Sequence, residues 1–130
     1  MISSIRLDGT TACMHLSGAA DTCAFVAYIG QVLCPTLKQG DVVVMDNLAV
    51  HKSPEVLRLV AAAGAEVRFL PAYSPDLNPI EKMWSKIKAL LRSAEARTPE
   101  QLDQAISLAF SKITSKDAAG WFASCGYSII

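Results

Sequence analysis

The 130-residue chain has no excess of charge of either sign, because 12 Lys and Arg side chains balance 12 Asp and Glu side chains. A protein that binds DNA on its own usually has a clear basic excess, since neutralisation of phosphates supplies much of the affinity. The composition therefore argues against a self-sufficient DNA-recognition module. A hydrophobic fraction of 52% and a mean hydropathy of +0.30 suggest that a partner covers part of the apolar surface.

Long hydrophobic runs are also absent. No stretch approaches the ~20 apolar residues that span a bilayer, and residues 1–6 lack the apolar segment of a secretory signal. We therefore expect a cytoplasmic protein with no membrane partner. The four cysteines form no CxxC pair, and neither His15 nor His51 completes a zinc spacing. Reduced thiols are the expectation.

The pattern of turn residues, apolar strands and helix starts predicts one α/β domain over residues 1–130. The Asp8-Gly9 turn between apolar stretches predicts a hairpin. Two further strands, at residues 41–45 and 65–70, flank a helix that starts at Pro54, which is the pattern of a parallel βαβ unit. Since residues 42–45 are all apolar, we expect that strand to be covered on both faces. Other helices are expected over residues 21–33, 79–93, 98–113 and 116–125.

Two acidic residues are the main candidates for chemistry. Asp46 ends the apolar strand, and Glu81 follows a helix start at Asn78-Pro79, with 34 residues between the two acids. A carboxylate at the carboxyl end of a strand and another on a later helix can converge on divalent metal, which suits phosphodiester chemistry. A third carboxylate is not obvious. The same residues also fit a structural interpretation, because Asn78 and Glu81 form a capping-box pattern and Asp46 can satisfy a turn.

Nearby residues extend this candidate site. On a helical wheel Ser85, Lys88 and Arg92 lie within about 40° of Glu81. His51 and Lys52 follow the Asp46 strand at the edge of the sheet where ligand sites gather, although His51 also fits a solvated loop residue.

An aromatic residue lies in the loop between the two acids. Tyr73 can stack on a base or pack the loop down, and packing is the favoured interpretation.

Two stretches carry a resemblance to a known family: VMDN at positions 44–47, with HK at 51–52, and FLPAYSPDLNPIE at 69–81. They resemble the catalytic domain of Tc/mariner-like superfamily transposases in the bacterial insertion-sequence branch. The resemblance implies an RNase H-like mixed sheet flanked by helices and a DDE active site. Asp46 and Glu81 match its second and third acids, which hold two Mg²⁺ or Mn²⁺ ions.

The resemblance also implies a first acid on a central strand ahead of the hairpin. We expect that strand to precede Met1, so that the domain is truncated at its N-terminus and inactive alone. The complete enzyme would cut and join DNA at insertion-sequence ends and target, with His51, Lys52, Lys88 and Arg92 as DNA contacts. Expected protein partners are a second copy or an upstream transposase segment. The alternatives are an inactive remnant that acts as an interaction module and another RNase H-like nuclease.

Overall fold

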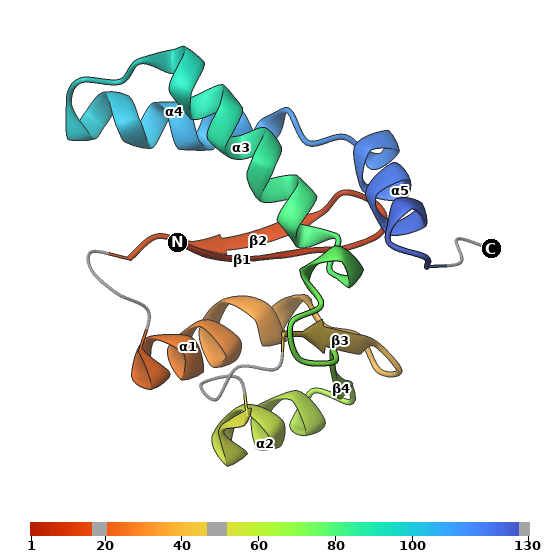
Figure 1. Ribbon diagram of the computed structural model, residues 1–130. Coiled ribbons are helices and arrows are strands. Elements are labelled where there is room, and N and C mark those ends of the chain that lie inside the picture. Colours follow the sequence, from red (N-terminus) through yellow and green to blue (C-terminus); the bar gives the residue numbers. More distant parts are fainter. Residues whose placement is uncertain (17–20, 47–51, 128–130) are drawn as a thin grey trace. The chain divides into compact units, whose positions relative to one another are not determined.

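The computed structural model describes residues 1–16, 21–46 and 52–127 (Figure 1). Within these ranges it is an α/β protein with five α-helices and two two-stranded sheets, which confirms the predicted α/β class. Residues 1–4 and 12–78 form a first compact unit, and residues 5–11 and 79–130 form a second. No helix of the described ranges is long and apolar enough to cross a bilayer. A single domain over residues 1–130 stays a prediction.

The predicted hairpin is present. β1 (Ile2–Ile5) pairs with β2 (Thr11–Met14), and the connection turns at Asp8 and Gly9. The Asp8 carboxylate accepts a hydrogen bond of 2.8 Å from the backbone N–H of Thr10. Gly9 has φ +92°, and a Cβ there would lie 3.0 Å from the backbone of Thr114. Both the left-handed conformation and the close approach therefore require glycine.

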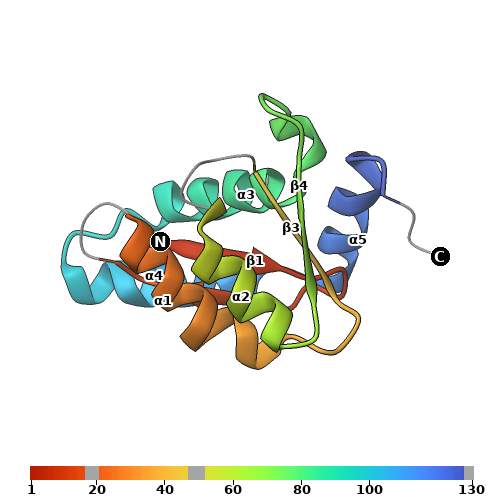
Figure 2. The same ribbon diagram turned by 90° about the horizontal axis from the view of Figure 1, so that it is seen from below.

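The first unit is built around a parallel strand pair. β3 (Val42–Met45) and β4 (Glu66–Phe69) lie side by side in Figures 1 and 2, with Val43 opposite Val67 and Met45 opposite Phe69. The connecting α2 (Pro54–Ala62) completes the predicted βαβ unit. Before it, α1 (Thr22–Tyr28) is capped by the Asp21 carboxylate and continues as a π-helix (Ile29–Leu33) and a 3-10 turn (Cys34–Thr36).

Only one face of this strand pair is covered. The core of the unit joins Met45 to side chains of α1, the π-helix and α2: Phe25, Tyr28, Ile29, Leu33, Val56 and Val60. On the opposite face Val42 and Val44 remain 51% and 37% exposed. The expectation that both faces of this strand are covered was therefore wrong within the first unit. Alternate residues of a strand point to opposite faces. The helices that cover the Met45 face therefore leave Val42 and Val44, on the other face, exposed to solvent.

Tyr28 fastens α1 to the hairpin inside the first unit. Its hydroxyl donates a hydrogen bond of 2.7 Å to the backbone carbonyl of Ala12 in β2. Burial raises the pKa of Tyr28 to about 12, because a phenolate would lose its hydration there. The hydroxyl therefore stays protonated, and able to donate, across the physiological range.

The second unit is mainly helical. α3 (Ile80–Ala94) packs against α4 (Pro99–Ser111), with Met83, Ile87 and Ala109 forming its buried core. The rings of Trp84 and Phe110 meet edge to face with their centroids 6.1 Å apart. The Thr98 side chain caps α4.

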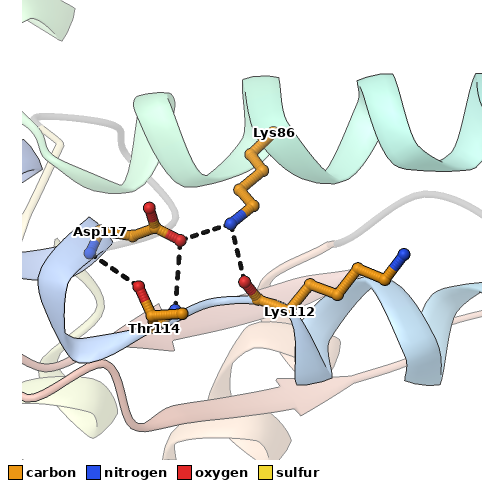
Figure 3. A network of polar contacts seen from close by, with 4 residues as sticks. All are labelled: Lys86, Lys112, Thr114 and Asp117. Carbon is orange, nitrogen blue, oxygen red and sulfur yellow. Dashed lines mark hydrogen bonds and ion pairs between the residues drawn. The ribbon is translucent and has the colours of Figure 1, made fainter.

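A polar network ties α5 (Ser115–Ser124) to α3 (Figure 3). Thr114 and Asp117 form a capping box at the start of α5. Lys86 of α3 forms an ion pair with the Asp117 carboxylate and donates a hydrogen bond of 2.7 Å to the carbonyl of Lys112. The hydrogen bond from Lys86 holds the pKa of Asp117 below its usual range.

Candidate active site

Asp46 directly follows β3 at its carboxyl end and is half-buried. The strand ladder reaches this point, because the backbone N–H of Leu70 donates a hydrogen bond of 2.8 Å to the carbonyl of Met45. The carboxyl ends of β3 and β4 therefore meet at the edge of the pair where Asp46 lies. Ligand sites in α/β proteins gather at such edges.

The side chain of Asn78 holds the Asp46 carboxylate. Its amide Nδ2 donates a hydrogen bond of 3.0 Å to Asp46 Oδ1, and Asn78 is only 9% exposed. The capping-box interpretation of Asn78 was wrong, since α3 begins after Pro79 and has no side-chain cap. The local pattern of Asn followed by Pro is typical of a helix start, and nothing in it indicates a partner 32 positions earlier.

α3 presents Glu81 on a polar stripe. Glu81, Ser85, Lys88 and Arg92 are all exposed, as the helical wheel predicts. Glu81 lies in the first turn and Arg92 in the last, which suits the partial charges of the helix ends. Asp46 belongs to the first unit and Glu81 to the second.

The remaining predicted contacts lie after β3. Lys52 is exposed. His51 lies outside the described residues.

Tyr73, in the loop between β4 and α3, departs from the favoured expectation. Its side chain is 101% exposed, so it does not pack the loop down. Its φ of +59° is in the left-handed region, which is rare for a bulky side chain. No feature of the sequence indicates this conformation, because a Tyr-Ser-Pro sequence fits an ordinary turn equally well.

The donor set at Asp46 fits a hard divalent cation. A carboxylate can accept one hydrogen bond and still offer lone pairs to a cation, and a hydrogen-bonded partner of this kind orients metal-binding carboxylates in general. Within the described residues, however, no group of three or more His, Cys, Asp or Glu side chains is placed to hold a metal. A single carboxylate such as Asp46 can serve as one of the ligands of such a cation.

The sequence also matches a known family over most of its length. Residues 1–103 match the profile of the DDE superfamily endonucleases. The chain belongs to that family. No curated protein sequence matches it.

Membership in the DDE superfamily endonucleases supports a nuclease- or transposase-like function. The two small sheets and five helices of the described residues are consistent with the RNase H-like domain of this family. DDE endonucleases generally use divalent metals, and the Asp46 carboxylate is a suitable ligand for one.

Proposed function

We propose that this chain is part of a Tc/mariner-like DDE transposase that cuts and joins DNA at the ends of an insertion sequence. The hydrogen bond from Asn78 to Asp46 carries the proposal. It fixes a carboxylate at the carboxyl end of β3 by means of a nearly buried amide, which a solvated strand-end residue does not need. The family match supports an endonuclease function for this carboxylate.

Asp46 and Glu81 are the proposed metal ligands. Glu81 is three positions after Asn78, and the covalent chain alone keeps their Cα atoms within about 11 Å of each other. Bound Mg²⁺ or Mn²⁺ would activate the attacking oxygen and stabilise the leaving one. Because Mg²⁺ is often held by one or two carboxylates together with phosphate and water, two acids supply only part of the coordination.

The basic side chains are proposed to position the DNA strand. Lys88 and Arg92 follow Glu81 along the exposed stripe of α3, and Lys52 follows Asp46 in the sequence. His51 is proposed as a further contact on its sequence position alone. Such contacts to phosphates orient the strand without reading its sequence.

A nicking assay tests the proposal. Purified chain, supplemented with an upstream transposase segment that supplies the first acid, is incubated with supercoiled plasmid and Mn²⁺, alongside Asp46→Asn, Glu81→Gln and the control Glu95→Gln. We expect Mn²⁺-dependent nicking to fall at least about 100-fold in both site variants, because losing a ligand exceeds the 10–100-fold effect of losing a residue that supports one. Nicking that survives both substitutions at the original rate would remove these residues from the site.

A second function has its own support. An inactive interaction module that binds a transposase is the second candidate, because the sequence offers no obvious third carboxylate to complete the metal site. The two functions give different results in the same assay. A chain that never nicks DNA, with or without Mn²⁺, but co-elutes with a second copy of itself or with an intact transposase, supports the second function.

A further inference from the structure

The loop between β4 and α3 starts and ends beside Asp46. At its start, the N–H of Leu70 bonds to the carbonyl of Met45 at 2.8 Å. At its end, the amide of Asn78 bonds to Asp46 Oδ1 at 3.0 Å. The residues on either side of loop 71–77 are therefore hydrogen-bonded to two consecutive residues, Met45 and Asp46. Figure 2 shows this loop, in green, after β4.

The loop is stiffened internally. Pro71 and Pro75 fix two of its φ angles, which lowers the entropy lost when the loop is ordered. Residues Pro75–Leu77 form a 3-10 turn, in which the N–H of Leu77 donates to the carbonyl of Ser74 at 3.1 Å. These features hold the loop in one defined conformation.

Tyr73 lies near the middle of this loop, and its side chain is fully exposed to solvent. Its φ of +59° is unfavourable for a side chain with a Cβ, and glycine or asparagine would fit better. Its full exposure means that no burial of the ring offsets that cost. Unfavourable backbone conformations of this kind cluster at functional sites, where they present a side chain to a ligand.

The covalent chain keeps Tyr73 close to Asp46. Three peptide units separate it from Leu70, so their Cα atoms lie within about 11 Å. Successive nucleotides of a strand are about 3.4 Å apart along the axis of a DNA duplex. The ring can therefore reach a base only a few nucleotides from a phosphate that a divalent cation would bridge to Asp46.

We propose that Tyr73 stacks on an unpaired nucleobase of the DNA strand whose phosphate lies at Asp46. This inference rests on the proposed function. Residues 71–77 contain no Lys or Arg, so the loop offers no charge attraction to phosphates. An exposed ring on a stiff loop instead suits stacking, which is sequence-tolerant because every base has a flat face. The unpaired base would be one displaced from the duplex during cutting.

A binding experiment with single-stranded DNA tests this role. The probe is a fluorescent thymidine oligonucleotide of about 15 nucleotides, which fits the usual footprint of single-strand binding. A second probe carries abasic sugars, so that phosphates remain and bases are absent. We expect Tyr73→Ala to weaken binding to the first probe about 5- to 150-fold and to leave the second unchanged. Tyr73→Phe should bind both probes as the original chain does.

Further variants separate stacking from structure. Tyr73→Gly relieves the backbone conformation, so it should keep or raise the melting temperature while losing base-dependent binding as Tyr73→Ala does. Leu57→Ala, at an exposed apolar position of α2, is the control and should change neither probe. Lys52→Ala should reduce the salt dependence of binding by about 0.7 in the logarithmic slope, whereas Tyr73→Ala should leave that slope unchanged.

The possible results are distinct. Binding by the original chain that is unaffected by Tyr73→Ala overturns the stacking role and leaves DNA binding intact. Equal weakening on both probes, together with a lower melting temperature, also overturns it, because the residue would then be structural. If the original chain binds neither probe at low salt, the stacking role and the DNA-binding part of the proposed function fail together.

Discussion

At the scale of single residues, the tie between Asn78 and Asp46 organises the candidate site. Asn78 is only 9% exposed, and its amide donates a hydrogen bond to the Asp46 carboxylate. A buried amide without that acceptor would be destabilising, and a carboxylate without that donor would be less well oriented. The same bond therefore contributes to stability and positions Asp46.

Replacing either partner should separate these two effects. Asn78→Ala removes a hydrogen bond to a charged group, so we expect a loss of about 1.5–3 kcal/mol in the free energy of unfolding, measured by urea denaturation. Asp46→Asn keeps an oxygen that can accept from Asn78 and should change stability by less than about 1 kcal/mol. Equal destabilisation by both substitutions would contradict this account of the bond.

The sequence predicted the position of one acid of the pair better than the residue that holds it. Asp46 follows from an apolar run that ends in a carboxylate, which is a local pattern. Asn78 and Tyr73 do not, because a long-range partner and a left-handed φ depend on how the loop closes. Both residues were misinterpreted for one reason. The local sequence also fitted a simpler role, which was a helix cap for Asn78 and packing of the loop for Tyr73.

At the scale of elements, helical periodicity was the most reliable signal. The apolar face of α3 with Met83 and Ile87, and its polar stripe with Glu81, lie where the 3.6-residue period places them. The capping box of Thr114 and Asp117 was missed, although Thr followed three positions later by Asp resembles the usual pattern. The coverage of β3 was misjudged, because an all-apolar run does not reveal which faces receive helices.

The attachment of α5 should depend on pH through Asp117. Its pKa is lowered in the folded state, chiefly by the hydrogen bond from Lys86, so its contribution is present above the ordinary carboxyl range. That contribution is lost as pH falls through the lowered pKa. We expect Asp117→Asn to be about 0.5–1 kcal/mol less stable than the original chain at pH 7, as for a partly exposed ion pair.

Thermal melts between pH 7 and pH 3 would measure this effect. The stability difference between the original chain and Asp117→Asn should shrink once the pH drops below the ordinary aspartate value of 3.8. Glu95→Gln, at an exposed position, is the control and should show no such convergence. A difference that stays constant over the whole range would exclude the ion pair with Lys86 as its source.

At the scale of the whole molecule, the described residues form two hydrophobic cores, one in each compact unit. The α/β class followed from the sequence, because alternating strand and helix signals are enough to predict it. The division into two two-stranded sheets did not follow, since strand pairing depends on contacts between distant segments. The exposed Val42 and Val44 mark the face of the first unit where apolar surface remains in contact with solvent.

Titration of Mn²⁺ into the chain, followed by electron paramagnetic resonance, tests the central claim that Asp46 and Glu81 hold the same metal. Asp46→Asn and Glu81→Gln should each weaken Mn²⁺ binding at least about 10-fold. The double variant should bind Mn²⁺ only slightly more weakly than the single variant of lower affinity, because ligands of one site are coupled. Mn²⁺ affinity that is unchanged in both single variants, or losses that simply add in the double variant, would contradict a shared metal site.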